Sequence, residues 1–457
     1  MTDRNFVTVN PCVMCQPMGS VLAFKGVENS MLLMHGSQGC STYMRLHLAH
    51  HFREPVDIAS SSLSEKGAVY GGSENLKKGL RNVIERYNPK VIGVATTCMA
   101  ETIGDDVPNI IKEFKEEEGI GDDLSRDIQI IAVSTPSYNE SHISGYIKAI
   151  DAIVRHNTIG GTKKTPNGMV NIIPTEHLSP ADIREIKQVT SDISGSYILL
   201  PDISDTFDAP MQNDLPKIAN GGTSVTDIAD MVNSNASIGM GSINHNPAVE
   251  YLAETHGVPG LNVPMPIGLG NTDTFFETLS NISGHQIPEK YINERGRLLD
   301  AMVDVHKYLY GVRSAVYGDP DKVIGIVSLM LEVGMYPVLV VSGSKSPNFR
   351  EGVESLIKEM RPDCETTILD GVDFDTFNDS VRSIGPDLLI GDSNGKYISQ
   401  AENIPLVRVG LPIHDRVGAQ RLLMVGYRGA MELIDRITNT ILEAKEIEEP
   451  KMQICPI

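Results

Sequence analysis

The feature that most constrains the fold of this chain is the repeated alternation of short apolar runs with amphipathic stretches. The apolar runs are rich in Val and Ile and are predicted as strands buried on both faces; they cover 31–36, 90–98, 128–134, 170–175, 197–202, 314–318, 336–343 and 386–392. Stretches with helical periodicity lie between them, at 73–87, 107–118, 181–193 and 321–334. Strands that alternate with helices of this length form βαβ units, so the sequence predicts an α/β fold with mostly parallel sheets flanked by helices.

The length of the chain predicts more than one domain. At 457 residues it exceeds what a single core normally supports, and two or three domains of roughly 100–200 residues are expected. The composition shifts near 160–167, and a helical stretch at 289–310 leads into the last α/β block. We therefore predict three Rossmann-like domains, at residues 1–160, 161–300 and 301–457.

The charge of the chain narrows the range of partners. The formal net charge is −20, from 39 basic and 59 acidic residues; this argues against nucleic acid and anionic membranes, which bind basic surfaces. The first residues, MTDRNF, lack the pattern of a signal peptide. The longest apolar segment, 327–341, is interrupted by Glu332, Gly334 and Pro337, so no membrane span is predicted. We expect a cytoplasmic protein.

Three cysteines lie where an α/β fold presents ligands. Cys98 ends one predicted strand, Cys40 follows the run MLLMHG, and Cys15 lies in NPCVMCQPMG, while Ser137 follows the strand at 128–134. Ligands of open parallel sheets bind beyond the carboxyl ends of the strands, so these side chains can converge. Gly19, Gly36 and Gly39 beside them allow the backbone to approach a bulky group. The alternative interpretation is that each cysteine packs as a small apolar side chain.

Thiolates select zinc or iron–sulfur clusters among biological metals. Zinc sites usually show two local CxxC pairs, and this chain has one, Cys12/Cys15. That pair follows Asn-Pro near the start of the chain, not a strand, so it does not fit a thioredoxin-like motif. Three dispersed cysteines leave a cluster short of its usual four thiolates, which suggests that a partner subunit supplies the rest. Cys364 and Cys455 lack glycine neighbours and are predicted to be incidental.

Other sequence patterns give weaker or negative signals. His47, His50 and His51 share a predicted helix, whose histidine face is expected to meet solvent or a partner. No GxGxxG follows a strand, and neither GxxxxGK[ST] nor GxSxG occurs. Nucleotide binding is therefore not predicted, despite the Rossmann-like pattern.

From about residue 10 to 443 the chain resembles β-type subunits of the nitrogenase component 1 (dinitrogenase) superfamily. The motifs that carry this resemblance are CQPMG at 15–19, HGSQGC at 35–40, HFREP at 51–55, TTCMAETIGDD at 96–106 and TPS at 135–137. In catalytic β subunits (NifK type) the matching cysteines ligate the P-cluster, an eight-iron (8Fe-7S) cluster shared with the α subunit. The resemblance thus implies that Cys15, Cys40 and Cys98 are metal ligands, and it places Ser137 where a serine ligates the oxidised cluster. The molybdenum-iron cofactor is expected on the α-type partner.

The same resemblance includes a scaffold paralogue (NifN type), which with its partner holds a 4Fe-4S cluster and matures the precursor of the molybdenum-iron cofactor. The three cysteines with Ser137 favour the catalytic subunit. Cys12, the short N-terminus, and the segments 386–396 and 412–437 are more similar to scaffold sequences. The expected function is therefore the assembly scaffold, with the catalytic β subunit as the alternative. Cys12 leaves open which of two nearby thiols is the ligand.

The resemblance also implies the partners of the chain. These are a homologous α-type subunit (NifE or NifD type), in a heterotetramer of two α-type and two β-type chains, and a reductase iron protein that delivers electrons. Two further readings remain open: a nitrogenase-like reductase of another substrate, and a metabolite-binding α/β protein with structural cysteines.

Overall fold

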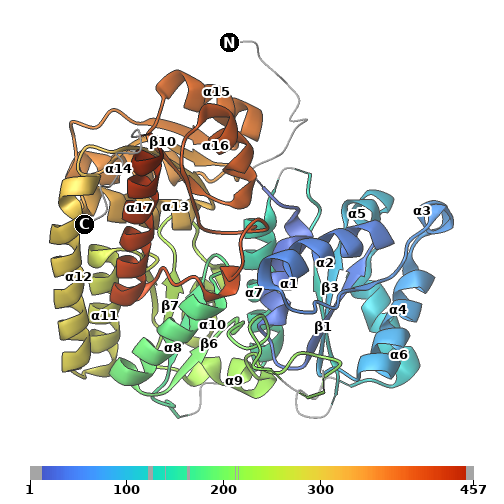
Figure 1. The fold of residues 1–457 in the computed structure, drawn as a ribbon. Helices are drawn as coiled ribbons and strands as arrows, with labels where there is room; N and C mark the ends of the chain where they lie inside the picture. Colours follow the sequence, from blue (N-terminus) through green and yellow to red (C-terminus); the bar gives the residue numbers. More distant parts are fainter. Residues whose placement is uncertain are drawn as a thin grey trace.

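Three parallel sheets organise the protein (Figure 1). The computed structural model describes residues 13–121, 127–138, 140–161, 165–211, 213–214 and 216–448, so Cys12 and Cys455 lie outside the described residues. The strands are β1 (Ser30–His35), β2 (Ala59–Ser60), β3 (Val91–Thr96), β4 (Gln129–Val133), β5 (Val170–Pro174), β6 (Tyr197–Leu199), β7 (Ala236–Met240), β8 (Gly260–Val263), β9 (Arg313–Gly318), β10 (Tyr336–Ser342), β11 (Thr367–Asp370), β12 (Leu388–Gly391) and β13 (Leu406–Arg408).

The strand orders are β2-β1-β3-β4, β6-β5-β7-β8 and β11-β10-β9-β12-β13. Every pair of neighbouring strands in these sheets is parallel. The predicted α/β fold with parallel sheets flanked by helices is therefore confirmed. Each sheet draws its strands from one of the three expected segments; the domain boundaries near 160 and 300 stay predictions.

Helices cover the faces of the sheets. They are α1 (Gln16–Lys25), α2 (Gln38–Phe52), α3 (Glu65–Tyr70), α4 (Ser73–Tyr87), α5 (Cys98–Ile103), α6 (Val107–Glu118), α7 (His142–Thr158), α8 (Pro180–Ser194), α9 (Val225–Asp230), α10 (Pro247–His256), α11 (Leu269–Ser283), α12 (Glu289–Leu309), α13 (Pro320–Glu332), α14 (Phe349–Met360), α15 (Phe374–Ile384), α16 (Lys396–Glu402) and α17 (Gly426–Glu448). Short 3-10 turns lie at 231–233, 393–395 and 419–421. Among the described residues, no helix is long and apolar enough to cross a membrane.

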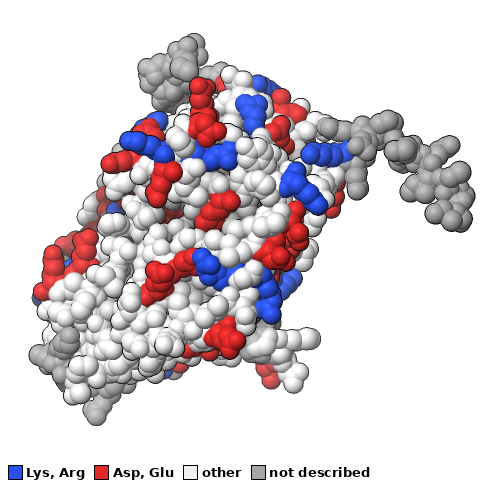
Figure 2. Space-filling view, turned by 90° about the vertical axis from the view of Figure 1, so that its left-hand side faces the viewer, with Lys and Arg blue, Asp and Glu red and all other residues white. Residues whose placement is uncertain are grey.

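The face that carries α12 and α14 is shown in Figure 2. Positive and negative side chains are interspersed there, beside a broad uncharged area. That distribution agrees with the acidic balance of the sequence, 59 acidic against 39 basic residues.

A buried aspartate connects the middle and last parts of the chain. Asp182 and Ser179 form a capping box at the start of α8. The other carboxylate oxygen of Asp182, Oδ1, accepts hydrogen bonds from the backbone N–H groups of Met424 and Val425, at 2.7 and 3.2 Å. Asp182 is fully buried, so this one side chain fixes both the start of α8 and the approach to α17.

We expect Asp182→Ala to destabilise the protein by about 3 kcal/mol or more, because it removes a cap and leaves two buried N–H donors without an acceptor. The matched control is Asp373→Ala, which removes the cap of α15, where the Asp373 side chain accepts a hydrogen bond from the N–H of Thr376. Unlike Asp182, Asp373 serves in this comparison only as a helix cap. The control is expected to cost about 1 kcal/mol. Denaturant unfolding of both variants measures the difference, and equal losses would contradict the connecting role of Asp182.

Candidate metal centre

Two of the candidate cysteines follow neighbouring strands. His35, the last residue of β1, lies opposite Thr96, the last residue of β3. Cys40 lies in the first turn of α2, directly after β1, and Cys98 is the first residue of α5, directly after β3. Because these two strands are parallel neighbours, the chain topology itself brings both cysteines to the carboxyl edge of the N-terminal sheet. In Figure 1 this edge lies at the top of the sheet, below α5.

Ser137 and Cys15 reach the same edge by different routes. Ser137 follows β4, which pairs with β3. Cys15 precedes α1, and α1 packs against α7, the helix that follows Ser137. Cys15 forms an isolated antiparallel bridge with Ser141, and the N–H of His142 donates to the carbonyl of Met14 at 3.0 Å. Cys15 therefore lies at the edge because of helix packing and not because of a strand of its own.

Ser137 connects two of the candidate cysteines, Cys98 and Cys15. The backbone N–H of Ser137 donates to Sγ of Cys98 at 3.2 Å, and Oγ of Ser137 accepts from the N–H of Gln16 at 2.7 Å. Although Cys15 is exposed, partial desolvation by the surrounding protein raises the pKa of its thiol; a hydrogen bond with Ser137 opposes this shift, and the charges of Cys40 and Cys98 add to it. The thiol of Cys15 thus lies close enough to Cys40 and Cys98 to be affected by their charges.

The site opens to the surface. Cys15 is exposed, and Cys40 and Cys98 are partly buried. Cys15 immediately precedes α1, and Cys40 lies in the first turn of α2. The positive end of a helix dipole stabilises a nearby thiolate, which is the form that binds metal. The arrangement offers three soft anionic donors on one open edge.

Two of the three neighbouring glycines, Gly36 and Gly19, are needed for contacts within the chain, and that they also make room for a ligand stays a prediction. A Cβ atom on Gly36 would lie 2.1 Å from Oγ1 of Thr97, and one on Gly19 would lie 1.8 Å from the carbonyl oxygen of His142. Gly36 lets the loops after β1 and β3 meet, and Gly19 lets α1 approach α7. Gly39 has open space around it, since its nearest neighbour would be Oγ of Ser37 at 3.8 Å.

His35 and Asp105 hold the site loops in place, and the sequence analysis did not single them out. Nδ1 of His35 contacts Oγ of Ser61, and its Nε2 contacts Oδ2 of Asp105, both at 3.0 Å. Asp105 also accepts from the N–H of Gly72. Burial lowers the pKa of His35, against the effect of Asp105. The signal was available, because His35 opens the motif HGSQGC and Asp105 lies in TTCMAETIGDD.

The histidines of α2 do not all face outward, as the sequence had suggested. His51 is 4% exposed, and its Nδ1 accepts the N–H of Ile413 at 2.9 Å. Burial lowers the pKa of His51 to about 3, so the ring is neutral. The prediction of a solvent-facing or partner-facing histidine was therefore wrong for His51.

Cys364 is buried beyond α14, where its thiol contacts Thr366.

We expect Ser137→Ala to lower the stability of the chain by about 1–3 kcal/mol, because the N–H of Gln16 loses its acceptor at a buried helix start. Ser134→Ala is the control: this exposed hydroxyl donates to Glu101 only at the surface, and its loss is expected to cost about 0.5 kcal/mol or less. Thermal unfolding of both variants measures the effect. A neutral Ser137→Ala would show that this hydroxyl does not support Gln16.

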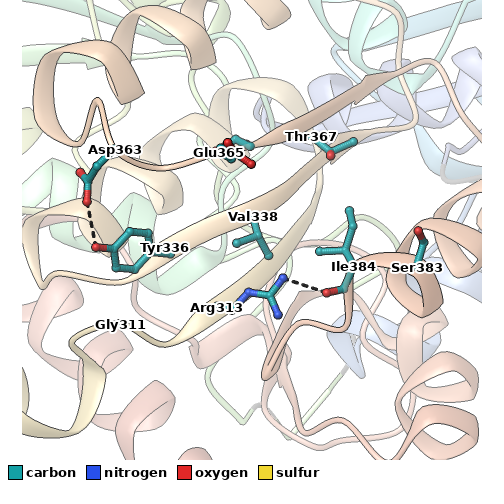
Figure 3. A pocket seen from close by; sticks show the side chains of 10 residues that line it. Gly311, Arg313, Tyr336, Val338, Asp363, Glu365, Thr367, Ser383 and Ile384 are labelled. Carbon is teal, nitrogen blue, oxygen red and sulfur yellow. Dashed lines mark hydrogen bonds between the residues drawn. The ribbon is translucent and has the colours of Figure 1, made fainter.

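A separate pocket of about 850 Å³ lies at the C-terminal sheet (Figure 3). It is at the edge where the strands of that sheet begin, whereas the cysteines lie where the strands of the N-terminal sheet end. Arg313 and Tyr336, the first residues of β9 and β10, lie on its wall. Arg313 donates to the carbonyls of Gly385 and Ile384, and the Tyr336 hydroxyl contacts Asp363 at 3.0 Å. These polar groups already have hydrogen-bond partners within the chain. The pocket also lies at the amino-terminal edge of the strands, where parallel sheets do not usually bind ligands.

Comparisons with known proteins show which family the chain resembles. A family model described as nitrogenase component 1 type oxidoreductase matches residues 15–442. A relative from Methanococcus maripaludis, named nitrogenase molybdenum-iron protein beta chain, is 41% identical over 453 residues, covering 97% of each chain. A relative of the same name from Clostridium pasteurianum is 36% identical over 448 residues, covering 98% of this chain and 96% of its own. The solved structure "Nitrogenase Cp1 at pH 6.5" aligns with a TM-score of 0.92 at 34% identity, over 100% of this chain and 98% of that chain.

Proposed function

Because the chain belongs to the nitrogenase component 1 type oxidoreductase family, we propose that it is the β chain of a catalytic molybdenum-iron protein that reduces dinitrogen. The observation that carries this proposal is the convergence of Cys15, Cys40 and Cys98 beside Ser137 on one exposed edge. The relatives bear the name of the catalytic β chain, so they favour this alternative over the assembly scaffold expected first.

The donor set fits an interfacial iron–sulfur cluster of the P-cluster type. Three thiols from three separate segments face one edge, and iron–sulfur clusters are held by cysteine thiolates. The mutual repulsion of these sulfur atoms, which contributes to the raised pKa of Cys15, is relieved when cationic iron binds them. Further thiolates would come from an α-type partner of the NifD kind, in a heterotetramer of two α-type and two β-type chains.

A bound cluster supplies one-electron redox chemistry. The residues of this chain position it and set its surroundings. Cys15, Cys40 and Cys98 bind the iron, and the N–H of Ser137, which donates to Sγ of Cys98, withdraws charge from that sulfur. Ser137 places its hydroxyl beside the same ligands. The molybdenum-iron cofactor belongs on the α-type partner, and a reductase iron protein delivers the electrons.

The surface around the cysteines suits a protein partner. Tyr43 and Leu46 of α2 are 42% and 51% exposed, and Tyr138, next to Ser137, is 57% exposed. The pKa of Tyr43 is raised by burial and by the charge of Cys15, which places its ring near that thiol. Exposed aromatic and apolar side chains beside an open metal site are typical of an interface core, where a partner excludes water.

The proposal is tested by producing the chain anaerobically together with the α-type subunit encoded beside it and with the reductase iron protein. We expect reduction of labelled dinitrogen to ammonia once the complex carries its mature cofactor. As a control, the same complex without the iron protein should be inactive. A complex that produces no ammonia but supports maturation of the cofactor for another nitrogenase would instead establish the scaffold function.

A further inference from the structure

A second group of ligand-type side chains lies buried where the three sheets meet. His142 begins α7, after the N-terminal sheet; His177 follows β5 of the middle sheet; and Asp319 lies between β9 and α13 of the C-terminal sheet. The three residues are 2%, 5% and 7% exposed. One ligand atom from each lies within 4.8 Å of the other two. Each sheet therefore contributes one metal-binding side chain to one buried point.

The imidazole of His142 has nitrogens that are available as ligands, and that of His177 lies close to the same carboxylate. Nδ1 of His142 has no hydrogen-bond partner, and its Nε2, 3.1 Å from Oδ1 of Asp319, is not aligned with that oxygen as a hydrogen bond. Nδ1 of His177 lies 3.9 Å from Oδ2 of Asp319. A neutral imidazole with an unused lone pair is the form that binds metal.

The surroundings carry several buried carboxyl groups: Glu176, Asp319, Asp321 and Asp392. Glu176 accepts the N–H groups of Asp321 and Lys322 at the start of α13. Asp321 accepts backbone N–H groups at 242–244, at distances of 2.6 to 3.1 Å. These two carboxylates are thus already committed to the backbone. Asp319 instead contacts the two imidazoles and the ammonium of Lys322.

We propose that His142, His177 and Asp319 bind one divalent transition-metal cation, zinc by preference, that joins the three parts of the fold. Two imidazoles and a carboxylate suit zinc better than magnesium or calcium, which prefer oxygen ligands. Zinc ligands lie about 3.3 Å apart when bound at about 2.0 Å from the metal. The ligand atoms lie within 4.8 Å of one another, so the widest spacing must close by up to about 1.5 Å. The site is separate from the cysteine site and does not depend on the proposed function.

Lys322 provides the strictest test, because its ammonium lies 3.2 Å from Oδ2 of Asp319 and competes with a metal for that oxygen. If the metal site exists, Lys322→Met removes the competitor and zinc should bind about tenfold more tightly. If the ammonium of Lys322 itself neutralises the buried carboxylate of Asp319, and no metal does, the same variant should lose stability and bind no zinc.

The experiment measures zinc binding to the full chain in a background where all six cysteines, Cys12, Cys15, Cys40, Cys98, Cys364 and Cys455, are replaced by Ser, which excludes binding by thiols. We expect about one zinc ion per chain, and a loss of affinity of about a hundredfold or more in His177→Gln and Asp319→Asn. The control is His156→Gln. His156 lies on the same helix as His142, and its own Nε2 contacts Gln129. The affinity of this control variant for zinc should equal that of the parent. Cobalt should give the visible spectrum of a nitrogen- and oxygen-ligated site in the parent and the control. Equal zinc binding in all variants, or none even in Lys322→Met, would overturn the proposal.

Discussion

Replacing Cys98 by Ala is expected to remove most of the iron and acid-labile sulfide from the interface between this chain and its α-type partner. Cys98 begins α5 at the end of β3, and its sulfur accepts the N–H of Ser137 at 3.2 Å. Its position is therefore fixed by a central strand of the sheet and by a backbone hydrogen bond. A cluster that loses one of its thiolate ligands is expected to be incomplete or absent.

The matched control is Cys364→Ala, which removes a buried thiol beyond α14 that contacts Thr366. This control should retain its iron and lose at most about 1–2 kcal/mol of stability from the small space it creates. Iron and sulfide analysis of the anaerobically purified complexes compares the two variants. If Cys98→Ala kept the full iron content of the parent, Cys98 would not be a ligand.

Gly145→Ala is expected to destabilise the protein by about 3 kcal/mol or more, and to lower the iron content as well. An added Cβ at Gly145 of α7 would lie 1.9 Å from the carbonyl oxygen of Gln16, the first residue of α1. Because the clash is with backbone, α1 must move away from α7. Cys15 directly precedes α1, so it would move away from Ser137 and the other cysteines.

The control for this variant is Gly296→Ala, on the exposed side of α12, where an added Cβ meets nothing within 4 Å. Alanine has the higher helix propensity, so this control should stabilise the chain by up to about 1 kcal/mol. Denaturant unfolding and iron analysis together separate the two effects. A Gly145→Ala protein as stable as the control would contradict the close crossing of α1 and α7.

Much of the fold follows from local periodicity. The helical patterns at 73–87 and 107–118 coincide with α4 and α6, and the patterns at 181–193 and 321–334 differ from α8 and α13 by one or two residues at their ends. These helices carry one apolar face, which gives a clear period of 3.6. The Val/Ile-rich runs became central strands such as β3 and β10, because strands buried on both faces are continuously apolar.

Elements without such a period could not be found in this way. Every residue of α1 is buried, including Gln16 and Lys25, so the helix has no polar face to reveal its period. In β8 three of the four residues are exposed, and β7 contains Ser237 and Gly239, so neither strand shows an apolar run. Their structure depends on contacts with distant parts of the chain, which the local sequence does not report.

In the candidate site, too, some positions follow from the local sequence and others depend on tertiary contacts. Strand ends predict that Cys40, Cys98 and Ser137 share one edge, because they follow neighbouring parallel strands. The position of Cys15 depends on the packing of α1 against α7, and the support from His35 depends on its contacts with Ser61 and Asp105. These are tertiary contacts between distant segments, so only the structure reveals them.

The most direct test of the account is the iron content of the interfacial site in a complex of this chain with its α-type partner that lacks the molybdenum-iron cofactor. The family resemblance implies about eight iron atoms for each pair of chains if Cys15, Cys40 and Cys98 hold their half of a P-cluster. About four iron atoms would point to the scaffold, and a colourless complex without iron would contradict the account altogether.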